Sequence, residues 1–126
     1  MTASRPVFDA SAVLALMQRE TGWEKLQRVQ PGTMVNAVNL SEVLAKLVSH
    51  GMPAAAAQAA FDALHMEVTP FEPLMALKSA QFVQKQISLG DRCFLAACLH
   101  GTGWTSDRNL AAVVVGKGAP HLKFFR

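Results

Sequence analysis

The sequence predicts an α/β domain in which helices on both faces flank a short, mainly parallel sheet, an α/β/α sandwich. Short apolar or β-branched stretches alternate with longer segments whose apolar residues recur every three or four positions, and this alternation is typical of βαβ units. Hydrophobic residues make up 51% of the chain and charged residues 17%, a composition that excludes a disordered protein. A length of 126 residues without a repeat or linker predicts a single domain over residues 1–126.

The first elements follow from apolar spacing and from residues that interrupt it. Arg5 to Asp9 predicts a short buried strand that stops at an acid, and a helix is expected over residues 10–19, where apolar side chains fall at helical spacing. A short helix is predicted over residues 23–29, before Pro and Gly end it. The β-branched run from Thr33 to Val38 then predicts the second strand.

The next helix has a recognisable start. Asn39 precedes Glu42 by three residues, the spacing of a capping box in which Asn39 is the N-cap. An alanine-rich helix is predicted over residues 53–64, with Pro53 as its first residue, and it is a candidate to face another chain. The remaining elements are expected to be a strand at 66–71, a helix at 72–87, a buried helix at 92–100, a strand at 104–105, a helical turn at 108–113, a loop at 116–118 and an edge strand at 121–125.

Charge and cysteine content favour a soluble, cytoplasmic protein. The net charge of +3 and the pI of about 9.2 suit a polyanionic partner, although only mildly. Cys93 and Cys98 are five residues apart and face different sides of a helix, so we expect two small buried thiols in a reducing compartment rather than a disulfide. No apolar run approaches the roughly 20 residues of a membrane span and no targeting segment is recognised, so no membrane partner is expected.

Four of the acidic residues share one kind of position. Asp9 follows the first predicted strand, Glu42 lies in the first turn after the second, Asp91 begins the buried helix, and Asp107 follows the strand at 104–105. In a parallel sheet the carboxyl ends of strands and the N-termini of helices lie at one edge, where ligands bind. Clustered acids repel one another unless a cation neutralises them, and carboxylate oxygens suit Mg²⁺ or Mn²⁺. Such a site activates water for phosphoryl chemistry.

Two other functions compete with this hypothesis. Each acid taken alone is more commonly a helix cap than a ligand, and Glu42 can pair with Lys46 one turn on, so a non-catalytic α/β binding module stays open. An aspartyl-phosphate phosphatase with Asp9 as nucleophile is less favoured, because its acid/base Asp would stand where Ser11 is found. A dinucleotide-binding domain is excluded, because no glycine-rich loop follows the first strand.

The ordered set of acidic segments resembles a known family. The four segments are Val-Phe-Asp9-Ala-Ser11-Ala, Ala-Val-Asn39-Leu-Ser-Glu42-Val-Leu, Leu-Ser-Leu-Gly90-Asp91-Arg92 and Thr105-Ser-Asp107-Arg108. Over nearly the whole chain they resemble the PIN-domain nucleases, most closely the VapC-type toxins of bacterial toxin–antitoxin pairs. The resemblance implies a PIN-like fold and a metal-dependent endoribonuclease that cleaves single-stranded RNA.

The resemblance also implies roles for individual residues. Asp9, Glu42, Asp91 and Asp107 match the acids that bind Mg²⁺ or Mn²⁺, the last one weakly, through water or at a second site. Ser11 and Thr105 match hydroxyl residues that support the first and last acids, and Asn39 is a supporting residue at the start of its helix. The implied partners are RNA, a second copy in a homodimer, and a VapB-like antitoxin whose C-terminal segment fills a groove and blocks the site. Basic residues next to these acids are candidates to hold RNA phosphates: Arg92, Arg108 and, less strongly, Lys46.

Overall fold

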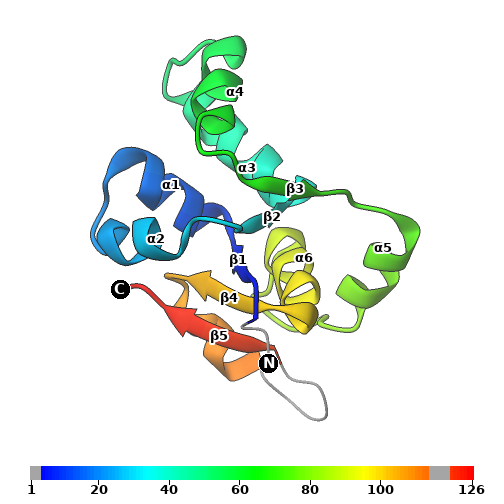
Figure 1. The fold of residues 1–126 in the computed structure, drawn as a ribbon. Coiled ribbons are helices and arrows are strands. Elements are labelled where there is room, and N and C mark those ends of the chain that lie inside the picture. Colours follow the sequence, from blue (N-terminus) through cyan, green and yellow to red (C-terminus); the bar gives the residue numbers. More distant parts are fainter. Residues whose placement is uncertain (1–3, 114–119) are drawn as a thin grey trace.

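The computed structural model describes residues 4–113 and 120–126, and in them an entirely parallel sheet lies between helices (Figure 1). The strand order is β3-β2-β1-β4-β5, so β1 is central and the first strand pairs with strands from both halves of the chain. This confirms the predicted α/β class. The sequence predicts a mainly parallel sheet, and all four pairs of neighbouring strands in the described structure are parallel. The strands are β1 (Pro6–Phe8), β2 (Met34–Asn36), β3 (Glu67–Thr69), β4 (Thr102–Thr105) and β5 (His121–Phe124).

The helices cover both faces of this sheet. The α-helices of the described part are α1 (Ala10–Gln18), α2 (Trp23–Val29), α3 (Ala37–Ser49), α4 (Ala54–Asp62), α5 (Pro73–Ala80) and α6 (Leu89–Ala97), with 3-10 turns η1 (Cys98–His100) and η2 (Arg108–Val113). In Figure 1, α6 lies against the sheet near its middle, and α3 and α4 extend beyond β2 and β3. Among these described helices, none is long and apolar enough to cross a membrane.

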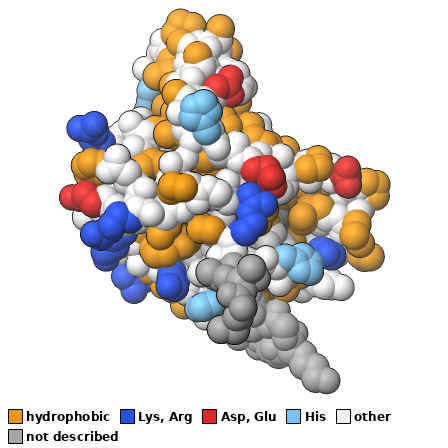
Figure 2. Space-filling view, in the orientation of Figure 1, with side chains coloured by type: hydrophobic (Ala, Val, Ile, Leu, Met, Phe, Trp, Pro, Cys, Tyr) orange, Lys and Arg blue, Asp and Glu red, His pale blue; other side chains and the backbone are white. Residues whose placement is uncertain are grey.

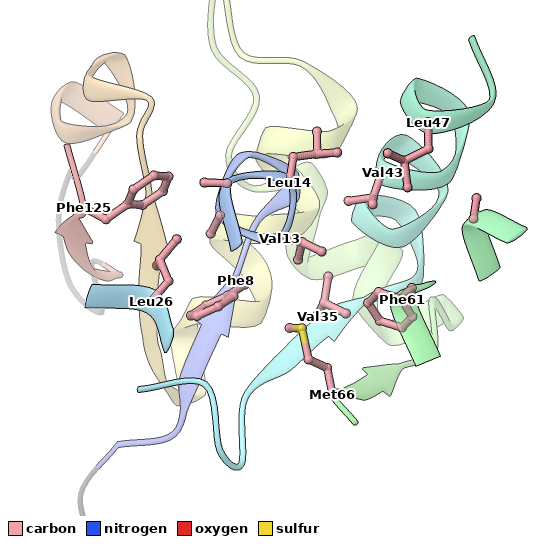
Figure 3. Close-up of a cluster of buried hydrophobic side chains, with 13 residues drawn as sticks. Phe8, Val13, Leu14, Leu26, Val35, Val43, Leu47, Phe61, Met66 and Phe125 are labelled. Carbon is pink, nitrogen blue, oxygen red and sulfur yellow. The ribbon is translucent and has the colours of Figure 1, made fainter. Parts of the chain in front are cut away.

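Alternation along β1 divides the core into two clusters. Phe8 is fully buried against side chains of α1, α2 and α3, including Val13 and Leu26 (Figure 3). Val7, its neighbour, is equally buried but packs with α6 and η2, including Phe94. Successive strand residues point to opposite faces of a sheet, so a strand buried on both sides reads as continuously apolar. Cys93 and Cys98 are free and buried, as predicted.

The predicted helix over residues 72–87 is wrong in its second half. Helix α5 ends at Ala80, turns follow, and Gln86 adopts a left-handed φ of 68°. A longer helix would bury only part of its apolar residues, because Leu77 and Val83 are 62% and 69% exposed while Phe82 and Ile87 pack on the second core cluster. Helical turns without tertiary packing are only marginally stable.

Other boundaries move for local reasons. Helix α6 begins at Leu89 rather than residue 92, because Ser88 caps it, and Pro53 is the N-cap of α4 rather than its first residue. Strand β4 starts at Thr102, two residues before the predicted strand at 104–105 and close to the end of the predicted helix at 92–100. A Cβ on Gly103 would lie 2.3 Å from Cys98 Sγ, so this glycine serves close packing under η1 rather than a turn. The predicted strands at 33–38 and 66–71 shorten to β2 and β3, and the loop predicted at 116–118 lies outside the described residues.

Candidate functional site

The carboxyl edge of the sheet gathers the candidate residues. Because all paired strands are parallel, the residues that end β1, β2 and β4 lie at the same edge as the N-termini of the helices that follow them. Asp9 directly follows β1, Asn36 ends β2 and Thr105 ends β4. Helices α1 and α3 begin at this edge, and α6 packs against both β1 and β2 with Asp91 in its first turn.

Asp9 is the most buried acid of this edge. Its side chain is the N-cap of α1 and accepts a hydrogen bond of 2.9 Å from Ala12 N, and only 8% of the residue is exposed. Ser11 Oγ donates to Asp9 Oδ1 at 2.6 Å, and Thr105 Oγ1 donates to Asp9 Oδ2 at 2.5 Å. Both hydroxyl residues singled out in the sequence therefore contact the first acid, one from each side.

Burial makes the Asp9 carboxyl harder to ionise than an ordinary aspartate. Burial raises the pKa of Asp9 from 3.8 to about 6; the hydrogen bonds from Ser11, Thr105 and Ala12 offset this in part, and the negative charge of Asp91 adds to it. Within residues 4–113 and 120–126 the ion pairs are Arg5 with Glu67 and Arg126 with Glu20, and neither includes Asp9. A positive charge at this edge would relieve the cost of burying the ionised carboxylate.

The two hydroxyls also order the loop after β4. Ser106 N donates to Ser11 Oγ at 3.1 Å, and Asp107 N donates to Thr105 Oγ1 at 3.0 Å. Asp107 itself accepts from Asn109 N at 3.0 Å through Oδ1, so it starts the η2 turn. The loop that carries Asp107 is thus tied to the residues that hold Asp9, although Asp107 has a capping role of its own.

The prediction that Asn39 caps the next helix is wrong. Helix α3 begins at Ala37, and its N-cap is Asn36, whose Oδ1 accepts from Asn39 N at 2.9 Å. Strand β2 therefore passes into α3 with no intervening loop, and Asn39 becomes the third residue of the helix, 1% exposed. Sequence reasoning missed Asn36, although an Asn three residues before the supposed cap was the available signal.

Asn39 instead joins two acidic elements. Its Nδ2 donates to Glu42 Oε1 at 2.7 Å and to the carbonyl oxygen of Gly90 at 3.1 Å. A Cβ on Gly90 would lie 2.3 Å from Glu42 Oε2, so the glycine lets the Glu42 carboxylate rest against the first turn of α6. Asp91 follows in that turn, where it forms a capping box with Ser88.

The basic residues depart from their predicted roles. Arg108 donates through Nε and Nη2 to the carbonyl oxygen of Arg126, at 3.2 and 3.0 Å, and lies over the Phe124 ring, so its guanidinium is engaged away from the acids. Lys46 is exposed, and the described part of the chain has no ion pair between it and Glu42. Arg92 is partly buried at the start of α6, and its Nε is buried without a hydrogen-bond partner in the described structure.

The candidate acids supply the type of ligand that a hard cation prefers, although they do not surround one point in the described structure. Among the described side chains, no group of three or more His, Cys, Asp or Glu residues is close enough together to hold a metal ion. The donors at the edge are all carboxylate oxygens, which suit Mg²⁺ or Mn²⁺. The negative charge of Asp91 adds a small contribution to the raised pKa of Asp9, as expected for two acids at the same edge.

Comparisons with known proteins agree with this arrangement. A family model described as "PIN domain" matches residues 7–114. The chain is similar in fold to VapBC2 from Rickettsia felis, solved bound to a DNA fragment from their promoter, with a TM-score of 0.68, 10% identity, and 94% of this chain and 97% of that one covered. It is also similar to PAE2754 from Pyrobaculum aerophilum, with a TM-score of 0.57, 21% identity, and 92% and 82% of the two chains covered. No curated protein matches it in sequence.

Proposed function

The chain belongs to the PIN-domain family, and on that premise we propose that it is a metal-dependent endoribonuclease, the toxin of a type II toxin–antitoxin pair. The observation that carries the proposal is the Asp9 carboxylate. It is 8% exposed, its pKa is raised to about 6, and hydroxyls hold it in place at the carboxyl end of the central strand. A mere helix cap needs neither this burial nor the second hydroxyl.

The cation would be held by the acids of this edge. Asp9, Glu42 and Asp91 are the direct ligands in our proposal, and Asp107 contributes weakly, through water or at a second site. A bound Mg²⁺ or Mn²⁺ supplies activation of water and neutralisation of negative charge developing on the phosphate. No protein general base is assigned.

The remaining residues of the edge position these groups and the substrate. Ser11 and Thr105 fix the Asp9 carboxylate by donating to its two oxygens, and oriented ligands bind a cation more tightly than free ones. Arg92, which follows Asp91 in the first turn of α6 and is partly exposed, is the residue we propose to contact an RNA phosphate. Arg108 is less favoured, because its guanidinium donates to the Arg126 carbonyl oxygen. Lys46, which is exposed on α3, remains a second candidate.

The surface charge is compatible with RNA. Figure 2 shows Lys and Arg side chains gathered on the left of the molecule, over α2 and the C-terminal end of the chain. Arg28 lies in the last turn of α2, and Arg19 and Arg126 stack on Trp23 and Phe125. With four acids assigned to one edge, the rest of the surface is more basic than the net charge of +3 suggests, which attracts a polyanion.

A homodimer is part of the proposal. Apolar side chains of α5 and its flanks are largely exposed, among them Leu74 at 61% and Leu77 at 62%, with Phe71, Val83 and Leu89 nearby in the sequence. Figure 2 shows hydrophobic side chains gathered on the right of the molecule, over α5. Contiguous apolar patches on a protein surface mark interaction sites. We assign this α5 patch, rather than the alanine-rich α4, to contact with a second copy.

An antitoxin is the second proposed protein partner. A hollow of about 280 Å³ lies among α1, α2 and α4 and is lined by Leu16, Met17 and Trp23, with Arg19 stacked on Trp23. An apolar groove with a cationic wall suits an amphipathic segment, such as the C-terminal part of a VapB-like antitoxin. We also propose a cytoplasmic location, because free thiols such as Cys93 and Cys98 are typical of a reducing compartment. Co-expression with a small DNA-binding protein encoded next to it should yield an inactive complex.

The test is cleavage of single-stranded RNA by the purified protein. With Mn²⁺ the protein should cleave RNA, and with excess chelator it should not. Asp9→Asn, which keeps the size of the side chain, should lower the rate by at least about 100-fold because it removes a proposed cation ligand. Asp62→Asn on α4 is the matched control and should cleave normally. Normal cleavage by a folded Asp9→Asn protein would refute the proposal.

A further inference from the structure

Two buried asparagines form a hydrogen-bonded chain that leads to Glu42. Asn36 and Asn39 are 0% and 1% exposed, among the most buried polar side chains of the described molecule. The chain runs from Asn39 N to Asn36 Oδ1 at 2.9 Å, from Asn36 Nδ2 to Asn39 Oδ1 at 2.6 Å, and from Asn39 Nδ2 to Glu42 Oε1 at 2.7 Å. Capping of α3 requires only the first of these bonds.

The direction of this chain is fixed at both ends. A backbone N–H can only donate, so the Asn36 atom facing Asn39 N must be its oxygen. The amide nitrogen of Asn36 then faces Asn39 Oδ1, which turns the nitrogen of Asn39 outward. At the far end a carboxylate and the carbonyl of Gly90 can only accept. Reversing either amide would set oxygen against oxygen in a buried place, so only one arrangement is satisfied.

The end of the chain joins two candidate cation-binding elements. The two protons of Asn39 Nδ2 serve Glu42 on α3 and the Gly90 carbonyl on α6, and Gly90 immediately precedes Asp91. The Glu42 carboxylate is otherwise the end of a flexible, exposed side chain. Without Asn39 in this orientation, binding a cation would require ordering that side chain first, which weakens affinity.

We propose that Asn36 is a positioning residue: by orienting the Asn39 amide, it sets the Glu42 carboxylate against the α6 turn that carries Asp91, in readiness for a divalent cation. The inference rests on the proposed function, since it concerns the same edge. It adds a residue that touches neither cation nor RNA. Outer hydrogen-bond partners of this kind alter metal affinity by about 10–100-fold when removed.

The test uses Asn36→Gly, which removes the amide while glycine still serves as an N-cap at little cost. Mn²⁺ affinity is measured by calorimetry without RNA, and exchange of the Asn39 side-chain amide protons by NMR with chelator present. We expect Mn²⁺ affinity to fall about 10–100-fold and Asn39 amide exchange to become faster. Phe61→Leu, at a buried core position of α4, controls for a general loss of stability. It should leave the Mn²⁺ affinity and the exchange rate of the Asn39 amide unchanged. If Asn36→Gly does not fold, Asn36→Ser is measured in its place.

The outcomes separate the inference from the proposed function. If the unmodified protein binds Mn²⁺ and the Asn36 variant binds it equally well, or keeps a slowly exchanging Asn39 amide, the positioning role is overturned and the proposed function stands. If the unmodified protein does not bind Mn²⁺, both are overturned together. A weaker affinity that Phe61→Leu shares would be a stability effect and would also overturn the positioning role.

Discussion

Thr105 Oγ1 donates a hydrogen bond of 2.5 Å to Asp9 Oδ2, although the two residues are 96 positions apart in the chain. The bond exists because β1 and β4 are parallel neighbours with Phe8 opposite Trp104, so the residues after this pair meet at the carboxyl edge. The same hydroxyl accepts from Asp107 N. One side chain therefore holds both the first acid and the loop of the last one.

Thr105→Val should damage the site more than the fold. Valine has the shape of threonine but neither donates to Asp9 nor accepts from Asp107 N, and we expect RNA cleavage to fall about 10–100-fold. The pKa of Asp9 should rise further, because the Thr105 hydrogen bond lowers it. Thr102→Val at the other end of the same strand, also buried, is the matched control. Equal rates for the two variants would contradict the role of Thr105.

The metal-free protein should lose stability as pH rises through 6. The pKa of Asp9 is raised from 3.8 to about 6 in the folded state, so the folded protein holds this proton more tightly than the unfolded chain. The stabilising contribution is complete below pH 3.8 and is lost above 6, a change of about 3 kcal/mol. Urea unfolding at pH 5 and 7.5 with chelator measures the part of this change that falls between those pH values, about 1–1.5 kcal/mol.

Asp9→Asn tests the assignment of this titration. The variant cannot ionise, so its stability relative to the unmodified protein should increase by about 1–1.5 kcal/mol between pH 5 and 7.5. Saturating Mn²⁺ should restore stability to the unmodified protein at the higher pH and have little effect on the variant. Parallel pH profiles for the two proteins would show that another group is responsible.

Gly90→Ala should separate stability from cation binding. Alanine favours a helix over glycine by up to about 1 kcal/mol, and the atoms it would meet are the end of the Glu42 side chain, which can move. We therefore expect unchanged or slightly higher thermal stability, with Mn²⁺ affinity reduced at least about tenfold because Glu42 leaves the α6 turn. Calorimetry measures the Mn²⁺ affinity, and thermal unfolding of the same sample measures its stability. A variant that binds Mn²⁺ normally would remove Glu42 from the site.

Charge on the α5 patch should abolish dimerisation. Leu74→Glu and Leu77→Glu place a carboxylate where the side chain is more than half exposed in the single chain, so monomer stability should change by no more than about 0.5 kcal/mol. Analytical ultracentrifugation should then show a monomer. Ala55→Glu on the exposed side of α4 is the control and should remain a dimer. If it is the α4 variant that dissociates, the interface lies there instead.

The sequence predicts well what hydrophobic periodicity and local breakers determine. Helix α2 matches its predicted range, β5 lies at the sheet edge as expected, and the parallel α/β class is confirmed, because a β1 strand buried on both faces leaves an unmistakable apolar run. Asp9 and its two hydroxyl partners are also accessible to sequence reasoning, because Asp9 and Thr105 lie at the ends of strands and Ser11 lies in the first turn of the helix that follows Asp9. That Thr105 reaches Asp9 depends on the parallel pairing of β1 with β4, which the sequence does not specify.

What could not be predicted depends on contacts between distant segments. The true cap of α3 is Asn36 rather than Asn39, because tight passage from β2 into the helix leaves no loop to signal the boundary. Helix α5 packs on α6 but leaves Leu74 and Leu77 exposed, and periodicity alone does not reveal how far such a helix continues. Arg108 is drawn to the C-terminal carbonyl, a contact that adjacency to Asp107 conceals.

The position of β4 also determines when the site can exist during synthesis. A ribosome releases the chain from its N-terminus at about 5–20 residues per second, so Asp9, Glu42 and Asp91 all emerge before Thr102 begins the strand that flanks β1 on its second side. Until then the first acid lacks its Thr105 partner and the central strand has an open edge. A growing chain thus carries three of the four acids through translation before β4 brings Thr105 to Asp9.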